Sequence, residues 1–252
     1  MNAVFPYASD GNPLHTLQLY GTPCKGPWVI FIHGGAWFAY VKAVITSRRD
    51  PRQTFHDGDP LFKYLLAKKR RFSCAGLNYR LSPAVRHPAH LSDVIAGLMF
   101  LKERYEMDDY MLVGHSAGAS LAFQSAQHVP RCRAVIGIEG IYDLQDLVRE
   151  YPDYGGFVES AFGADQEIWT KASPTQIVTH WLDLSDVTVQ LIQSREDELL
   201  SPRQTERFFP ILQHTGVALK EIAWIKGTHN SSLTSHECHI VVDRLISQLF
   251  ET

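Results

Sequence analysis

A serine stands between two glycines where a short apolar run gives way to a segment of helical pattern. In residues 110–118, YMLVGHSAG, the apolar letters predict a buried strand, and the small residues that follow predict a helix. The spacing G-x-S-x-G in a strand–turn–helix context is typical of a turn so tight that larger neighbours of the serine would collide. We therefore predict that Ser116 is a nucleophile, backed by the free N–H groups of a helix N-terminus. A purely structural turn is the alternative.

A second glycine turn follows another predicted strand. Residues 28–32, WVIFI, are continuously apolar, as in a parallel strand covered on both faces, and they lead into HGGAW at 33–37. Glycines after a strand let backbone N–H groups face a site. We predict that Gly34 and Gly35, together with the N–H of Ala117, form an oxyanion hole. A Gly-Gly loop without a chemical role is the alternative.

A serine hydroxyl needs a base, and the base needs an orienting partner. When a serine lies on such a turn, the acid and then the histidine follow it in the chain, each on a loop just after a strand. Asp197 follows the predicted strand at 187–192, and His229 follows the one at 219–225. We predict Asp197 as the acid, with Glu198 as the alternative, and His229 as the base.

A metal site is a competing interpretation of the histidines near the C-terminus. His229, His236 and His239 lie close in the chain, and the last two are three residues apart, on one face of a helix. No acidic ligand stands at a suitable spacing, and a metal would leave Ser116 without a purpose. We therefore predict no metal.

The order of predicted elements indicates one domain over residues 1–252. Strands alternate with helices, which predicts an α/β fold with a mostly parallel central sheet flanked by helices on both faces. Helices are expected at residues 59–70, 91–101 and 240–250, and strands at 14–20, 28–32, 72–79, 110–113, 134–138, 187–192 and 219–225. Residues 38–58 predict a surface loop bordering the site. Residues 144–185, rich in aromatic residues, predict either a small cover over the site or peripheral helices.

Composition and charge exclude several kinds of partner. The net charge of −3 provides no basic field for nucleic acid, and no apolar run is long enough to cross a membrane. The four cysteines are scattered without a Cys-x-x-Cys pair, so we expect reduced thiols. No secretory signal is visible at the N-terminus, and we predict a cytoplasmic protein.

Taken together, the motifs resemble those of α/β-hydrolases of the hormone-sensitive-lipase-like esterase group. The likeness is greatest to the kynurenine formamidases, which share HGGxW, GHSxG and a GIYDL stretch. The matching segments are HGGAW at 33–37, NYRLSP at 78–83, GHSAG at 114–118, GIYDL at 140–144, DELLSPRQT at 197–205 and His229 with Asn230. Two departures stand out: Ala36 replaces the third glycine of a His-Gly-Gly-Gly loop, and only a short segment precedes His33, so a large N-terminal cap is not expected.

The resemblance implies hydrolysis of a small-molecule amide, N-formyl-L-kynurenine, to L-kynurenine and formate, a step of tryptophan catabolism towards NAD. It implies no cofactor, and it makes Trp37 and Tyr142 candidate substrate-binding residues, although Trp37 could equally wedge its loop. A general short-chain carboxylesterase and a non-catalytic binding protein of the same fold are the alternatives. The oligomeric state is not readable from the sequence, and a homodimer stays open.

Overall fold

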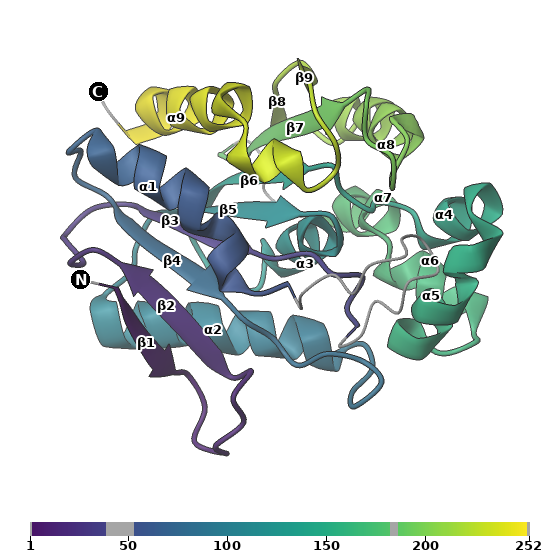
Figure 1. Cartoon of the computed structure of the whole chain (residues 1–252), viewed down its shortest axis with the longest axis horizontal. Helices are drawn as coiled ribbons and strands as arrows, with labels where there is room; N and C mark the ends of the chain where they lie inside the picture. The colour runs from purple at the N-terminus through teal and green to yellow at the C-terminus, as the bar shows by residue number, and fades with distance from the viewer. Residues whose placement is uncertain (1, 39–52, 182–185, 251–252) are drawn as a thin grey trace.

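A nine-stranded sheet crosses the described part of the molecule, with helices on both of its faces (Figure 1). The computed structural model describes residues 2–38, 53–181 and 186–250. The strand order is β1-β2-β4-β3-β5-β6-β7-β8, with β9 also paired to β7. The strands are β1 Ala3–Pro6, β2 Thr16–Tyr20, β3 Trp28–Ile32, β4 Ser73–Leu77, β5 Tyr110–His115, β6 Cys132–Ile138, β7 Thr188–Ser194, β8 Ala218–Leu219 and β9 Ala223–Ile225.

The sheet is antiparallel only at its N-terminal edge. β1 pairs antiparallel with β2, and β2 with β4, whereas every pairing from β4 and β3 to β9 is parallel. This confirms the predicted mostly parallel sheet. The sequence analysis did not predict β1, whose Pro6 weakens the strand pattern and which pairs with the predicted strand at residues 14–20. The predicted strand at 219–225 is two short strands, β8 and β9.

The helices divide between the two faces of the sheet. Buried side chains of α1 and α9 pack in one core cluster, and those of α2, α3 and α8 pack in the other. Successive side chains of a strand point to opposite faces of the sheet, so β3 contributes to both cores. Val29 and Phe31 pack in the cluster with α1 and α9, and Trp28, Ile30 and Ile32 pack in the cluster with α2, α3 and α8. The helices are α1 Asp59–Ala67, α2 Ala89–Tyr105, α3 Ala117–Ser125, α4 Leu144–Glu150, α5 Gly155–Phe162, α6 Gln166–Ala172, α7 Pro174–Ile177, α8 Arg203–Gln213 and α9 His236–Phe250.

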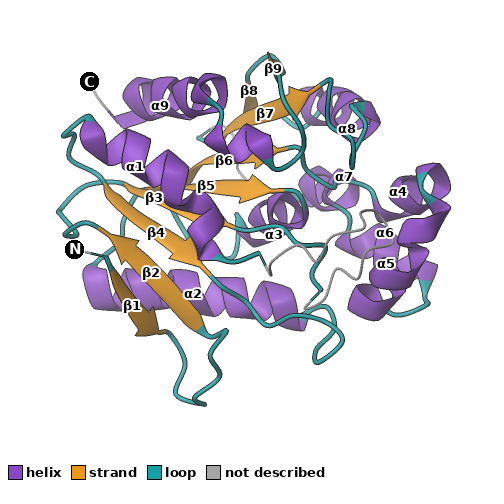
Figure 2. Ribbon diagram, viewed as in Figure 1, coloured by secondary structure: helices purple, strands orange, loops and turns teal. Residues whose placement is uncertain are grey.

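Helices α4, α5 and α6 gather beyond the carboxyl ends of the parallel strands, at the right of Figure 2. They are tied to the loop after β7, because the Tyr154 hydroxyl donates to the carbonyl of Leu199 at 3.0 Å. On the other side, Phe162 of α5 contacts the ring of Trp37. The segment therefore links two loops at the sheet edge where active sites of parallel sheets lie. The predicted loop at 38–58 lies mostly outside the described residues.

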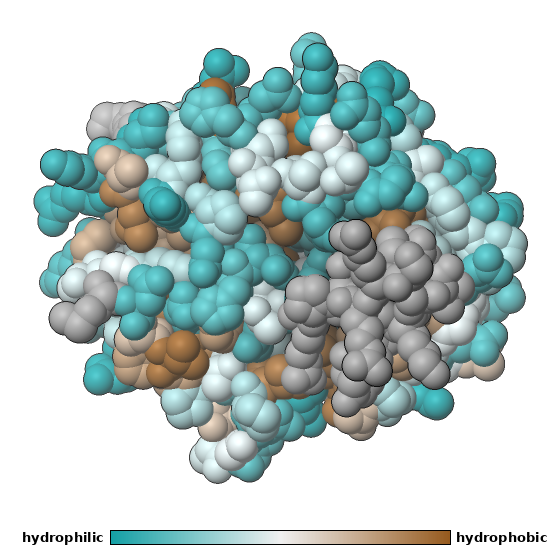
Figure 3. Space-filling view, in the orientation of Figure 1, coloured by the Kyte–Doolittle hydropathy of each residue, from teal (hydrophilic) through white to brown (hydrophobic). Residues whose placement is uncertain are grey.

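The surface is mainly polar on the face drawn in Figure 3, where apolar patches are small and separate. The most exposed large apolar side chains among the described residues are Val4, Ile168 and Trp224. The ring of Trp224 is covered by the Arg195 guanidinium at 3.9 Å. No helix in the described ranges is both long enough and apolar enough to cross a membrane. All four cysteines are free thiols. The homodimer stays a prediction.

Candidate active site

Ser116 occupies a strained turn between β5 and α3. Its φ of 54° lies in the left-handed region, which side chains other than glycine seldom adopt, and its N–H donates to the carbonyl of Ile138 at 2.9 Å. The turn is possible because Gly118 lacks a side chain: a Cβ there would collide with the carbonyl oxygen of Ile32. The close packing of helix on strand thus holds the serine, 7% exposed, at the carboxyl edge of the sheet.

The predicted oxyanion loop borders this serine. A Cβ on Gly34 would lie 2.9 Å from the Cβ of Ser116, so the loop after β3 can approach the turn only with glycine at that position. Tyr79 supports the loop from below: its hydroxyl donates to the carbonyl of Gly34 at 3.0 Å, and its ring stacks on His33 at 4.4 Å. Ala117 is the first residue of α3, so its N–H has no partner within the helix. The candidate donors thus lie beside Ser116.

The structure brings the predicted acid and base together. Nδ1 of His229 lies 2.8 Å from Oδ2 of Asp197. The other oxygen of Asp197 accepts the N–H groups of Leu199 and Leu200 at 2.9 and 2.8 Å. Glu198, the alternative acid, accepts the backbone N–H of His229 at 2.9 Å and does not pair with its ring. The pairing therefore favours Asp197, whose side chain is fully buried, as the orienting group.

His229 reaches the serine turn through the neighbour of the serine. Nε2 of His115 lies 3.1 Å from the carbonyl oxygen of His229, and the two rings are 4.6 Å apart between centroids. Among the described residues the Ser116 hydroxyl has no direct hydrogen bond to His229. Hydrogen bonds between nucleophile and base are often long before substrate binds, so this arrangement is compatible with a base that tightens onto the serine.

Gln53 closes the ring of loops around Ser116. Its Nε2 donates to the side-chain oxygen of Asn230 at 2.9 Å, while its Oε1 would be 2.6 Å from a Cβ on Gly34. Oε1 is buried and has no hydrogen-bond partner among the residues that the structure describes. The Gln53 side chain therefore lies between the loop that carries Gly34 and the loop that carries His229 and Asn230. Sequence reasoning did not single out Gln53, which lies in a polar stretch without a motif.

Trp37 and Tyr142, predicted to bind substrate, lie in the core. Both are fully buried. Trp37 meets Phe162 edge-on at 4.9 Å, and Tyr142 stacks on Phe208 at 4.5 Å. These contacts explain both side chains by packing, and a role in substrate binding stays a prediction.

Glu139, directly after β6, was missed as a site residue. It is fully buried, has a φ of 46°, and places Oε2 3.6 Å from Nδ1 of His229 and 3.6 Å from Nε2 of His115. Burial, followed by the charge of Asp197, raises the pKa of Glu139 to about 9. A signal was present in the sequence, because a carboxylate immediately follows a buried parallel strand at the edge that carries the other candidates.

Metal binding finds little support in the donor atoms. Among the described residues, the group close enough to share an ion is His115, Glu139 and His229, not the predicted set of C-terminal histidines. Nε2 of His115 faces a carbonyl, so it carries a proton, and Nδ1 of His229 is engaged by Asp197. Burial also holds the pKa of His115 well below its usual range, which keeps the ring neutral.

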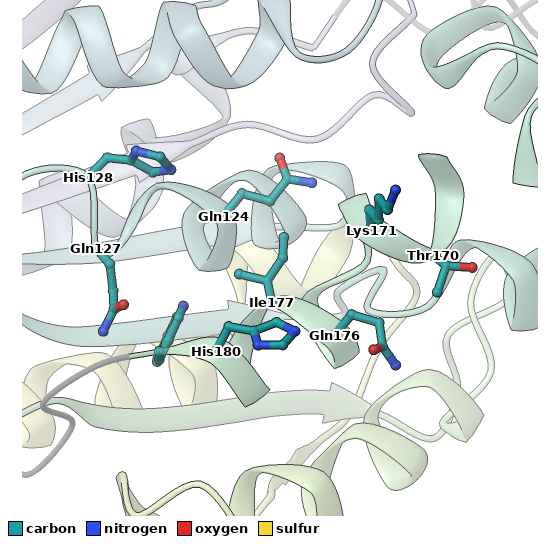
Figure 4. Close-up of a pocket in the computed structure, with 9 residues that line it drawn as sticks. Gln124, Gln127, His128, Thr170, Lys171, Gln176, Ile177 and His180 are labelled. Atoms are coloured by element: carbon teal, nitrogen blue, oxygen red, sulfur yellow. The ribbon is translucent and has the colours of Figure 1, made fainter. Parts of the chain in front are cut away.

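A surface pocket of about 380 Å³ lies apart from these residues, between the C-terminal end of α3 and helices α6 and α7 (Figure 4). Most of the residues that line it are of polar type, although they expose mainly apolar surface to it, and none of them is a predicted catalytic residue. Gln124 of the serine helix reaches this pocket, and its Nε2 donates to the carbonyl of Ala172 at 2.7 Å. The pocket therefore borders the far end of the helix that begins directly after Ser116.

Comparison with known proteins assigns the family. Residues 21–212 match the BD-FAE family model. The chain belongs to the BD-FAE family. This BD-FAE protein is also 38% identical to a kynurenine formamidase of Meyerozyma guilliermondii, over 92% of this chain and 88% of that protein. A kynurenine formamidase of Saccharomyces cerevisiae is 27% identical, over 80% of this chain and 82% of the relative.

Solved structures establish the α/β-hydrolase fold of this BD-FAE protein. Esterase B from Lactobacillus rhamnosis superposes with a TM-score of 0.77 at 20% identity, covering 98% of this chain and 85% of the esterase. A hyperthermophilic esterase from Pyrobaculum calidifontis gives 0.71 at 18% identity, over 99% and 85%. At these identities the likeness concerns the fold. The resemblance to the kynurenine formamidases expected from the short motifs is confirmed over nearly the whole chain.

Proposed function

We propose that this BD-FAE protein is a serine hydrolase that cleaves N-formyl-L-kynurenine to L-kynurenine and formate. The observation that carries the chemistry is the 2.8 Å pairing of His229 with Asp197 on loops that meet the Ser116 turn. The substrate is proposed from the relatives named kynurenine formamidase, which align with 92% and 80% of the chain. We also propose that the chain works in the cytoplasm as one catalytic domain.

In this mechanism His229 accepts the hydroxyl proton of Ser116 as the oxygen attacks the formyl carbonyl. Asp197 holds Nδ1–H of His229, which leaves Nε2 free to act as the base. The N–H groups of Gly34, Gly35 and Ala117 receive the charge that develops on the carbonyl oxygen. His229 then returns the proton to the departing arylamine. Water, deprotonated by the same imidazole, hydrolyses the formyl-serine and releases formate.

Helices α4, α5 and α6 form the cover in this proposal. They lie beyond the carboxyl ends of the strands and are bonded to the loop that carries Asp197 (Figure 2). A cover fixed to the catalytic loop would limit the space around the acyl group, which suits a formyl group better than a long acyl chain.

A short-chain carboxylesterase is the second candidate, favoured by the esterases among the solved structures of the same fold. The deciding experiment compares kcat/KM for N-formyl-L-kynurenine with kcat/KM for p-nitrophenyl acetate and butyrate. A formamidase should prefer the formamide by about 10²-fold or more, since the amino-acid chain of kynurenine, which the p-nitrophenyl esters lack, adds binding energy realised in the transition state. Ester turnover that equals or exceeds formamide turnover would favour the esterase.

A further inference from the structure

Two carboxyl groups converge on the ring of His229. Asp197 Oδ2 lies 2.8 Å from Nδ1, and Glu139 Oε2 lies 3.6 Å from the same nitrogen. The two acids come from different loops, after β7 and after β6, and both side chains are fully buried. The serine mechanism proposed above uses one carboxylate, so the second needs its own explanation.

The backbone fixes Glu139 in this position. Its φ of 46° is in the left-handed region, and its N–H donates to the carbonyl of Ile192 at 2.8 Å. A buried non-glycine residue in this conformation stays there only because its surroundings hold it. The side chain is therefore presented to His229 by the sheet, as Ser116 is presented by the turn one strand away.

A count of protons around Ser232 indicates the charge state of Glu139. Oγ of Ser232 lies 2.8 Å from Oε2 of Glu139 and 2.9 Å from the carbonyl oxygen of His229. A hydroxyl has one proton, whereas an ionised carboxylate and a carbonyl can only accept. Both contacts are hydrogen bonds only if Glu139 brings a proton of its own. The chain then runs from Glu139 through Ser232 to the backbone of His229.

The hydrogen bonds of Asp197 differ from those of Glu139. Its two oxygens face donors only: the N–H groups of Leu199 and Leu200 and the His229 ring at 2.8–2.9 Å, and Nε2 of Gln193 at 3.4 Å, an arrangement that a carboxylate without a proton can accept in full. Two buried carboxyls beside one imidazole do not both ionise readily, because like charges repel strongly there. The ionisable groups that face Glu139 from the surrounding elements are His115, Tyr142, Asp197, Glu198, His229 and Cys238.

We propose that Glu139 is a positioning residue for His229, uncharged while Asp197 is ionised, and the charged partner of the imidazole when Asp197 loses its charge. In the first state, Glu139 holds the backbone of His229 through Ser232 and leaves the ring to Asp197. In the second, the repulsion from Asp197 is gone, Glu139 ionises, and the 3.6 Å separation can close to a hydrogen bond of about 2.9 Å. The inference rests on the proposed function of His229 as the base.

The test measures how fast Ser116 is phosphonylated by a p-nitrophenyl phosphonate between pH 6 and pH 10. The variants are Asp197→Asn, Glu139→Gln and the double variant, and Asp197→Ala with and without Glu139→Gln is run in parallel because asparagine can offer an amide to Nδ1. In the Glu139→Gln variant, the new side-chain amide can still donate to Ser232. The rate of Glu139→Gln alone is the reference for the double variants, because it measures any loss that does not depend on Asp197.

In the Asp197 backgrounds, adding Glu139→Gln should slow the reaction about tenfold or more at pH 9 and have little effect at pH 6. A matched control is Glu196→Gln in the same backgrounds, since Glu196 accepts the N–H of Gly227 and does not contact His229. This control should leave the pH dependence unchanged. Equal rates with and without Glu139→Gln at every pH, in variants that are fully folded under the assay conditions, would overturn the proposal. An unreactive wild-type protein would instead overturn the proposed serine mechanism.

Discussion

The indole ring of Trp37 meets the ring of Phe162 edge-on, with 4.9 Å between centroids. The first follows the glycine loop and the second ends α5, so this contact joins the candidate oxyanion loop to the helices beyond the sheet edge. Trp37 has no exposed surface, and its φ of 58° is held by the surrounding structure. The contact explains why a large aromatic residue follows the two glycines.

Trp37→Ala should lower the free energy of unfolding by about 3–5 kcal/mol, because it removes a large buried ring. Trp37→Phe keeps part of the contact with Phe162 and should fold. In that variant, denaturant unfolding should show reduced stability while KM for N-formyl-L-kynurenine changes less than about threefold. A large rise in KM at unchanged stability would instead point to a direct contact with substrate.

Gly34→Ala should lower kcat by about 10²-fold, since the added Cβ would sit 2.9 Å from the Cβ of Ser116 and 3.0 Å from the carbonyl of His115. Gly156→Ala is the matched control, because a Cβ there has no atom within 4 Å. The control should retain full turnover and gain up to about 1 kcal/mol from the helix propensity of alanine. Equal turnover in both variants would remove the glycine loop from the site.

Ser116→Ala and His229→Ala should each lower kcat on the order of 10⁴-fold or more, because the nucleophile and the base act as one unit. The double variant should be little worse than either single variant. Circular dichroism and thermal melting verify the fold of each. Near-normal formamide turnover in a folded Ser116→Ala protein would refute the serine mechanism.

Chelation separates a serine mechanism from a metal-dependent one. Turnover should be unchanged after prolonged EDTA treatment, because Nε2 of His115 and Nδ1 of His229, the two nitrogens nearest Glu139, are already engaged by a carbonyl and by Asp197. The same preparation should lose its activity to a phosphonate reagent that modifies one serine per chain. Loss of activity with EDTA, restored by adding zinc, would contradict this expectation.

Glu139 should make stability depend on pH. Its pKa is raised to about 9, by burial first and then by Asp197, so folding favours the protonated form. The stabilising contribution is complete below the unfolded pKa of about 4.5 and is lost as the pH rises through about 9. Glu139→Gln should therefore raise the free energy of unfolding at pH 8 relative to wild type by about 1–3 kcal/mol, and less at pH 5. Parallel curves for the two proteins across this range would contradict the prediction.

Much of the site was predictable because most of its candidate catalytic residues lie in short sequence motifs. Local backbone requirements leave a recognisable pattern in the sequence. They mark the turn at Ser116 and the glycines at 34 and 35, and they set the order in which Asp197 and His229 follow. The structure brings Asp197 and His229 together at 2.8 Å, as their positions after successive strands indicated. The parallel sheet was equally readable, since its central strands are continuously apolar.

Other features depend on contacts between distant parts of the chain. Gln53 and Asn230 are 177 positions apart, and nothing near either residue indicates the pairing. The position of Glu139 directly after a buried strand indicates the edge of the sheet that carries the site, but only the fold shows that two histidines and Asp197 surround it. The helices that follow Trp37 and Tyr142 decide whether these two side chains lie in the core or face a ligand. The weak periodicity of those helices does not predict how they pack.

Hydrogen bonds connect helices α4 to α6 and the turn between them to the segment after β7. These bonds affect how the substrate range of such enzymes can change. Arg203 forms two hydrogen bonds, at 2.8 and 2.6 Å, with the buried carboxylate of Asp146, and the Tyr151 hydroxyl accepts the N–H of Ser201 at 3.0 Å. Exchanging the helical segment for that of another hydrolase, without its matching loop, would remove the carboxylate that pairs with Arg203 and the hydroxyl that holds Ser201, close to Asp197 in the chain. New substrate ranges in this lineage are therefore expected to arise by joint inheritance of the two segments, with the glycine loop left intact.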